Sequence, residues 1–150
     1  MFHVGILVPN MTDAAERFSD VLGLDFVEPI RVHVPDLDEG DTVQPWDVHL
    51  TYSTQGPMHV ELIEAAGHGA YGLQHGSGLH HIGAWCEDIK ERIAELGKLQ
   101  VSTEAVFRSG DEVLGAFFRP ASLLGTRFEI SPTSIREDWA AWLRGEKAFM

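Results

Sequence analysis

Hydrophobic and polar positions follow the same order in two short segments of the chain. The segment His3–Asn10 reads HVGILVPN and the segment His81–Asp88 reads HIGAWCED, at an offset of 78 residues. Each is an apolar run that begins with histidine and ends in polar residues, which predicts a strand that leads into a turn. Two such copies indicate an internal repeat.

A helical pattern follows each copy. Apolar residues recur three or four positions apart, which gives each segment one apolar face. These residues are Ala14, Phe18, Val21 and Leu22 in the first half and Ile89, Ile93 and Leu96 in the second. The pattern therefore predicts one helix in each half.

Residues beside the two helices predict where each one begins and ends. Thr12 or Asp13 is the expected N-cap of the first helix and Asp88 that of the second, because short polar side chains accept hydrogen bonds from the free N–H groups of a first turn. Gly23 and Gly97 stand where a helix C-terminus favours a positive φ. We therefore expect the two helices to close alike.

Three strand candidates come after each helix. They are Asp25–Val34, Asp47–Thr54 and Met58–Ala65 in the first half, and Leu99–Arg108, Glu112–Arg119 and Arg127–Ser131 in the second. Each half is thus predicted to be a βαβββ module, and the fold class is α+β.

The remaining segments complete the predicted organisation of one domain, residues 1–150. Ala66–Gly78, with five glycines, is the expected linker between module one, residues 1–65, and module two, residues 79–132. Pro35–Pro45 carries four acidic residues and is expected to be a solvated loop. Residues 133–150 are expected to hold a C-terminal helix, in which Trp139 packs back on the body.

Composition narrows the class of protein. A chain of 150 residues that is 44% hydrophobic can bury one core without covalent staples. The single cysteine, Cys86, excludes a disulfide framework within one chain and favours a reducing compartment. A net charge of -12 disfavours nucleic acid, and no apolar run reaches the length of a membrane span. We expect a soluble, cytoplasmic protein.

Histidine and glutamate recur in matching positions of the two halves. His3 and His81 begin the repeated first strand, while Glu61 and Glu129 each lie between apolar residues in the last strand of a module. A carboxylate at such a strand position needs water, a partner or a metal. A pseudo-twofold axis would bring the four side chains into one cleft, whose ligands suit Zn, Fe, Co, Ni or Mn.

The two halves resemble the paired modules of the vicinal oxygen chelate superfamily, which includes glyoxalase I, methylmalonyl-CoA epimerase and extradiol dioxygenases. The resemblance covers Phe2–Pro132. It is carried by His3–Asn10, Phe18–Leu24 (FSDVLGL), Val60–Glu64 (VELIE), Gly78–Gly83 (GLHHIG) and Leu124–Ile130 (LGTRFEI). It implies a glyoxalase-like fold, in which both modules form a curved mixed sheet around a metal cleft.

The same resemblance implies a set of metal ligands. His3, His81 and Glu129 match ligand positions of the family, and alternation along the strand is expected to turn His80 to the other face. The fourth ligand is either His49, on the third strand as in methylmalonyl-CoA epimerase, or Glu61, on the fourth strand as in glyoxalase I. We place His49 slightly ahead, with Glu61 and Glu129 as the catalytic carboxylates.

Three functions are compatible with this set. The first is a metal-dependent isomerase, lyase or epimerase that enolises an α-oxo or thioester substrate. The second is an Fe(II) extradiol-type dioxygenase, which requires that neither His49 nor Glu61 bind the metal. The third is a non-catalytic binding protein like the resistance members of the family. In each case the expected partner is a small molecule, and the expected assembly is a homodimer.

Overall fold

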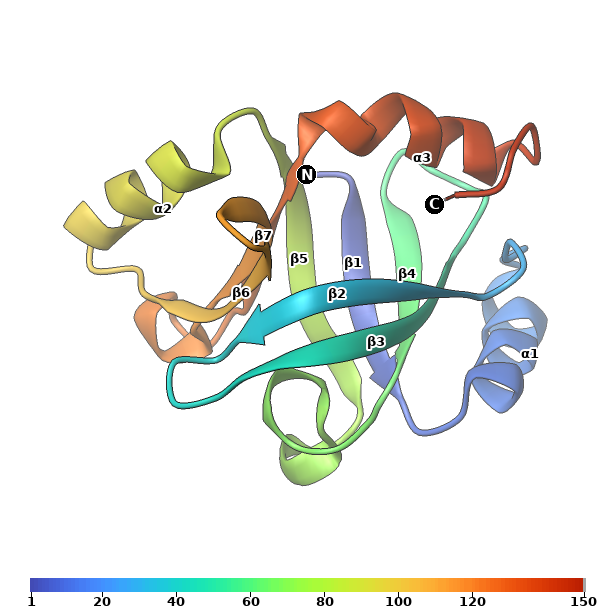
Figure 1. The fold of residues 1–150 in the computed structure, drawn as a ribbon. Helices are drawn as coiled ribbons and strands as arrows, with labels where there is room; N and C mark the ends of the chain where they lie inside the picture. The colour runs from blue at the N-terminus through green and yellow to red at the C-terminus, as the bar shows by residue number, and fades with distance from the viewer. Residues whose placement is uncertain (150) are drawn as a thin grey trace.

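The computed structural model describes residues 1–149 and all of their side chains except that of His75 (Figure 1). Each half contains a strand, a helix and three further strands, which confirms the predicted βαβββ repeat. The first module consists of β1 (His3–Val8), α1 (Met11–Leu22), β2 (Ile30–Asp38), β3 (Val43–Tyr52) and β4 (His59–Glu64). The second consists of β5 (Gly78–Cys86), α2 (Ile89–Lys98), β6 (Thr103–Ser109), β7 (Glu112–Phe118) and β8 (Phe128–Pro132).

The eight strands close into one curved mixed sheet in the order β1-β4-β3-β2-β6-β7-β8-β5. Within each module the first strand runs parallel to the last, as β1 does to β4 and β5 to β8. The modules meet twice, through antiparallel pairs β1–β5 and β2–β6. In Figure 1, β2 and β3 therefore cross in front of β5, β1 and β4 and enclose the interior of the sheet.

The strands bury side chains on both faces. On the outer face, Met11 of α1 packs with Val8 and Leu62, and Ile89 of α2 belongs to a second cluster with Ile130. Residues at alternate strand positions join a separate cluster inside the sheet, because successive side chains point to opposite faces. The two helices thus cover the outside and leave the interior to the other face of the strands.

A third helix, α3 (Arg136–Leu143), packs across one end of the sheet, above the ends of β5, β1 and β4 (Figure 1). Its residues Trp139, Trp142 and Leu143 are buried in the inner core. The Trp139 ring meets the rings of Phe2 and Tyr52 edge-on, at centroid distances of 5.2 and 5.5 Å. The expected C-terminal helix that packs back on the body is confirmed.

The helix ends differ in part from the prediction. The N-cap of α1 is Asn10, whose side chain accepts the N–H of Asp13 at 2.9 Å, so the choice of Thr12 or Asp13 was wrong. Asp88 is the N-cap of α2, and Gly23 ends α1 in the left-handed conformation, both as predicted. Gly97 lies inside α2, and the positive φ beyond that helix falls on Gln100.

The predicted acidic loop Pro35–Pro45 is mostly strand. β2 continues to Asp38, because its end pairs with β6 of the other module. β3 begins at Val43, which pairs with Asp38 of β2. Leu37 in that stretch is only 1% exposed. β2 and β6 also begin later than predicted, at Ile30 and Thr103.

The predicted linker Ala66–Gly78 contains two short 3-10 turns, Gly69–Tyr71 and Leu73–His75. Ala70 and Tyr71 are buried in the inner core, so this segment also closes part of the interior. Among the described residues, no helix is long and apolar enough to cross a membrane.

The aromatic contacts of α3 predict a large contribution to stability. We expect Trp139→Ala to lower the free energy of unfolding by about 3–5 kcal/mol, because it leaves a cavity between Phe2, Tyr52 and Trp85. Urea denaturation followed by circular dichroism measures the change. Leu124→Ala, at a fully exposed position, is the control. Equal denaturation midpoints for the two variants would show that the packing of Trp139 does not stabilise the fold.

Candidate metal centre

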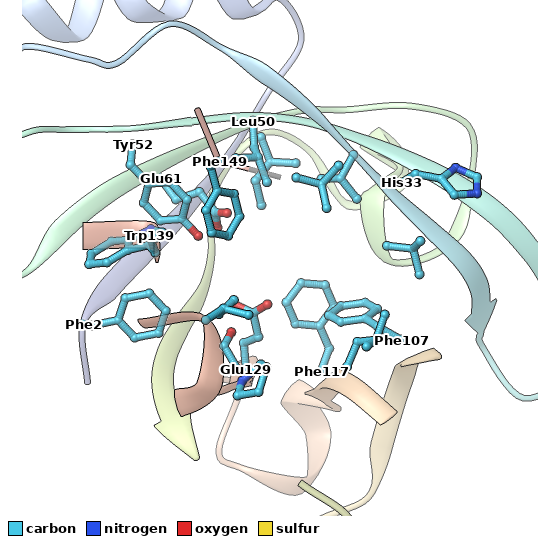
Figure 2. Close-up of a pocket in the computed structure, with 18 of the residues that line it drawn as sticks. Phe2, His33, Leu50, Tyr52, Glu61, Phe107, Phe117, Glu129, Trp139 and Phe149 are labelled. Atoms are coloured by element: carbon cyan, nitrogen blue, oxygen red, sulfur yellow. The ribbon is translucent and has the colours of Figure 1, made fainter. Parts of the chain in front are cut away.

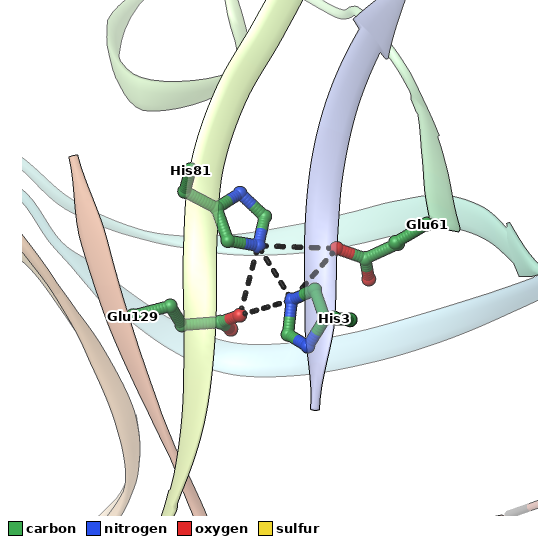
Figure 3. A group of neighbouring side chains, drawn as sticks. All are labelled: His3, Glu61, His81 and Glu129. Carbon is green, nitrogen blue, oxygen red and sulfur yellow. Dashed lines mark hydrogen bonds and ion pairs between the residues drawn. The ribbon is translucent and has the colours of Figure 1, made fainter. Parts of the chain in front are cut away.

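Four side chains from four strands meet inside the sheet: His3, Glu61, His81 and Glu129 (Figure 3). One nitrogen or oxygen atom of each lies within 4.8 Å of the others. The structure thus brings together the two histidines and two glutamates that the repeat predicts, and all four belong to one chain.

Strand register explains how the residues meet. In the antiparallel β1–β5 pair His3 lies opposite Gly83, and Gly5 lies opposite His81. The parallel neighbours then add one carboxylate each, because β4 places Glu61 beside Gly5 and β8 places Glu129 beside Gly83. Each module therefore contributes one histidine, one glycine and one glutamate in the same register, as expected for an internal repeat.

Each histidine ring lies over the glycine of the opposite strand. A Cβ atom on Gly83 would overlap the His3 ring, and one on Gly5 would overlap the His81 ring. Neither glycine has a positive φ, so the backbone conformation does not require glycine there. Glycine is required because the histidine ring fills the space of a side chain. Sequence reasoning missed these glycines, although the pattern His-x-Gly at the start of both repeats is a usable signal.

The distances between carboxylate oxygens and histidine nitrogens in this group match those between ligands of one metal ion. The Nε2 atoms of His3 and His81 are 2.7 Å apart. Glu129 Oε2 lies 3.0 Å from each of them, and Glu61 Oε2 lies 3.4 Å from His3 Nε2 and 3.2 Å from His81 Nε2. Ligands about 2.1 Å from a common ion lie ~3.0 Å apart at right angles and ~3.4 Å apart at tetrahedral angles.

Unpaired polar atoms also indicate a site for a cation. Glu61 Oε2, Glu129 Oε2 and His3 Nδ1 are buried and have no hydrogen-bond partner among the described residues. The two carboxylate oxygens approach the histidine nitrogens without hydrogen-bond geometry, and buried acceptors without donors are costly. A divalent ion bound between them would satisfy both oxygens, so these residues fit a metal.

Charge in the group shifts the pKa of all four members. Burial by itself lowers the pKa of His3, but the carboxylates of Glu61 and Glu129 raise it to about 10. The pKa of His81 is raised in the same way against its burial. Burial favours the neutral acids, yet the nearby histidines hold the pKa values of both glutamates below their usual range. The metal-free group thus keeps both carboxylates ionised and His3 protonated.

A hydrogen-bond chain orients His81. His80 Nε2 lies 2.6 Å from the carbonyl oxygen of Ala70, which can only accept, so this nitrogen carries a proton. Burial, together with the charges of His81 and Arg127, lowers the pKa of His80 to about 4 and keeps it neutral. Its Nδ1 then accepts from His81 Nδ1 at 2.9 Å. Deprotonated His81 therefore presents the lone pair of Nε2 to the group, as a metal ligand must.

The expectation that His80 points to the other face of the strand was wrong. The register between β1 and β5 shifts after Gly5, since Ile6 pairs with Leu79 and leaves His80 as the extra residue of a β-bulge. His80 and His81 consequently both face the interior, and both are buried. The bulge makes the contact between the two rings possible.

The structure does not bring His49, the expected fourth ligand, to the group. His49 lies on the outer face of β3, where its Nδ1 is 3.3 Å from Glu64 Oε1. Its neighbours Val48 and Leu50 face the interior instead. Glu61, the alternative that the sequence left open, lies in the group instead.

A cavity of about 310 Å³ opens directly beside the group. Glu61 and Glu129 both line it (Figure 2). The Tyr52 ring stands at the same wall as Glu61, and burial together with the negative charges of Glu61 and Glu129 raises the Tyr52 pKa well above its usual value. A small molecule in this cavity would contact both carboxylates.

Comparisons with known proteins agree with this geometry. A sequence model of the Glyoxalase/Bleomycin resistance protein/Dioxygenase superfamily matches residues 2–117. A comparison with curated protein sequences finds no match.

Several solved structures share the fold. A hypothetical protein from Bacillus halodurans is 23% identical, with a TM-score of 0.64 over 88% of this chain and 92% of its own. A methylmalonyl-CoA epimerase variant from Streptomyces coelicolor is 19% identical, with a TM-score of 0.63 over 88% and 92%. Methylmalonyl-CoA epimerase from Mycobacterium tuberculosis is 18% identical, with a TM-score of 0.60 over 87% and 85%.

The contact between histidine and glycine predicts that an added methyl group disrupts the centre. We expect Gly83→Ala to displace the His3 ring and to weaken the binding of Co(II), measured by competition with a chelator. Gly97→Ala is the matched control, because a Cβ there meets nothing within 4 Å. Unchanged affinity in Gly83→Ala would show that His3 does not depend on this contact.

The shifted pKa values predict how the stability of the metal-free protein depends on pH. The raised histidine pKa values contribute stability that is full below 6.5 and is lost as the pH rises through about 10 for His3. The lowered glutamate pKa values contribute stability that is present above 4.5 and is lost in acid. Thermal unfolding should therefore give the highest midpoint between about pH 4.5 and 6.5.

A bound metal should change this profile, because it requires neutral histidines. We expect the difference in melting temperature between metal-loaded and metal-free protein to grow as the pH rises from 6 to 9. A constant difference over that range would contradict ligation by His3 and His81.

Proposed function

Because the chain belongs to the Glyoxalase/Bleomycin resistance protein/Dioxygenase superfamily, we propose that it is a metal-dependent enzyme that enolises its substrate. The observation that carries the proposal is the buried group of two histidines and two glutamates at the wall of a cavity. Such a group suits an isomerase or epimerase that removes a proton beside a carbonyl group.

In this proposal His3, Glu61, His81 and Glu129 hold one divalent metal ion. Imidazole nitrogen and carboxylate oxygen suit Zn, Ni, Co, Fe or Mn. The ion, when bound, supplies a Lewis acid that polarises a substrate oxygen and makes the neighbouring C–H more acidic. The four side chains fix its place at the cavity wall, and the His80–His81 contact holds one ligand in the required tautomer.

The two glutamates serve as proton acceptor and donor. They approach the histidine pair from opposite sides (Figure 3), and their lowered pKa values keep them ionised at neutral pH. Glu61 accepts the α-proton, and Tyr52 lines the same cavity with its hydroxyl protonated, because its pKa is raised. Return of this proton by Glu61 to the neighbouring carbon gives isomerisation. Inversion of the original carbon needs a proton on the opposite face, which Glu129 delivers after it has taken one from solvent.

The methylmalonyl-CoA epimerases among the similar structures support an epimerase-type reaction, in which a proton leaves and returns beside a carbonyl. The dioxygenase alternative requires Glu61 to stand outside the ligand set, and nothing in the geometry of the group favours it. The homodimer stays a prediction, and the proposed chemistry does not depend on it, because one chain supplies all four residues.

Solvent deuterium exchange tests the proposed reaction. Metal-loaded protein should catalyse the exchange of the α-proton of α-hydroxyketones in D₂O, followed by NMR, and removal of the metal should stop it. Tight binding of such compounds without deuterium exchange would contradict the proposed enzyme and indicate a non-catalytic binding protein.

Two histidine variants test the proposed ligand set. His81→Ala should lose the metal measured by elemental analysis, along with the exchange activity, because it removes a ligand. His49→Ala should keep both, since this residue lies on the outer face of β3 and contacts Glu64. The opposite pattern would return His49 to the ligand set and remove His81 from it.

A further inference from the structure

The cavity beside the metal-binding group provides no strong counter-charge for an anion. Resting on the proposed function, we propose that the substrate is a neutral, ring-bearing, largely apolar molecule with two adjacent oxygens, and not an anion such as an acyl-coenzyme A ester. Charge, the shape of the walls and one unpaired donor support this substrate class.

None of the described residues that line the cavity is a lysine or an arginine. Among the described lining residues, the only acidic or basic side chains are Glu61, Glu129 and His33. His33 stands at the rim, where its ring is 62% exposed and lies 2.7 Å from the carboxylate of Asp47. An anionic group inside the cavity would therefore lose water without gaining a counter-ion, which is costly.

A bound metal ion would not supply the missing positive charge. A divalent ion bound by two carboxylates and two neutral imidazoles forms a centre with no net charge. Arg127, two residues before Glu129, is held by Glu104 and by the carbonyl of His80, so it is not available to a ligand. The whole chain is strongly acidic, with a net charge of -12, and repels an anion further.

Aromatic rings form opposite walls of the cavity. Phe2 and Trp139 lie on one side and Phe107 and Phe117 on the other, with Leu50 between them (Figure 2). Phe107 and Phe117 meet edge-on at a centroid distance of 5.2 Å, as Phe2 and Trp139 do. Such walls favour a flat apolar ring, which packs against faces and edges of aromatic side chains.

One polar group at this wall has no partner within the described chain. The indole N–H of Trp139 is buried without an acceptor among residues 1–149, although Trp139 lines the cavity. A neutral carbonyl or ether oxygen of a ligand would satisfy this donor. The polar donors of the lining, this N–H and the hydroxyl groups of Tyr52, Tyr71 and Ser131, are thus neutral, where anion sites offer cationic side chains.

A pair of matched compounds tests the substrate class. Phenacyl alcohol is a neutral aromatic α-hydroxyketone, and its analogue with a carboxylate on the ring differs by one negative charge. Calorimetry with the metal-loaded protein should give at least about tenfold tighter binding of the neutral compound. Equal or tighter binding of the carboxylated compound would overturn the proposal.

Two charge variants separate the cavity lining from the charge of the whole chain. Ile135 lines the rim and is 37% exposed, so Ile135→Arg adds a cation there without entering the core. It should strengthen binding of the carboxylated compound by about threefold to fivefold. Leu124→Arg adds the same charge at a fully exposed position outside the lining and should leave the ratio unchanged. Equal effects of both variants would contradict a role of the lining.

The same measurements distinguish failure of the substrate class from failure of the proposed enzyme. Without enolisation, neither compound exchanges deuterium, yet the preference for the neutral one persists in metal-loaded and metal-free protein. If instead the proposed substrate class is wrong, the carboxylated compound binds as well as the neutral one, whether or not deuterium exchange occurs.

Discussion

Antiparallel pairing between β1 and β5 places each histidine ring on the glycine of the opposite strand, and the site depends on this contact. Any larger residue at Gly5 or Gly83 would occupy the space of a ring. The parallel partners β4 and β8 then deliver one carboxylate each at the same level of the sheet. The junction that joins the two modules is therefore also the junction that assembles the four ionisable groups.

Burial of these groups is tolerated because they compensate one another. Each carboxylate faces imidazole nitrogens at 3.0–3.4 Å, and the histidine pKa values rise against the effect of burial. A hydrophobic interior would be simpler to stabilise, so such a cluster is typical of a functional site. The rest of the cavity is apolar and aromatic, which concentrates the polar chemistry at one wall. Fold alone assigns no substrate, and this contrast is what the proposed substrate class rests on.

Most of the fold was predictable, because the repeat and its periodicities are local features of the chain. The order of strands and helices and the cap at Asp88 follow from residues close together in sequence. The prediction failed where partners are distant. The acidic segment Pro35–Pro45 forms strand because its end pairs with β6, and the 3-10 turn Gly69–Tyr71 is buried because it closes the interior.

For the site, the sequence by itself determined two matched pairs, His3 with His81 and Glu61 with Glu129. Each pair occupies equivalent strand positions of the internal repeat. Tertiary structure alone placed Glu61 with the two histidines, left His49 outside the group and turned His80 inward. Which face of a strand points inward depends on its distant partners, and one bulge reverses it. The aromatic cavity was likewise invisible in sequence, since its walls come from residues that only the closed sheet and α3 bring together.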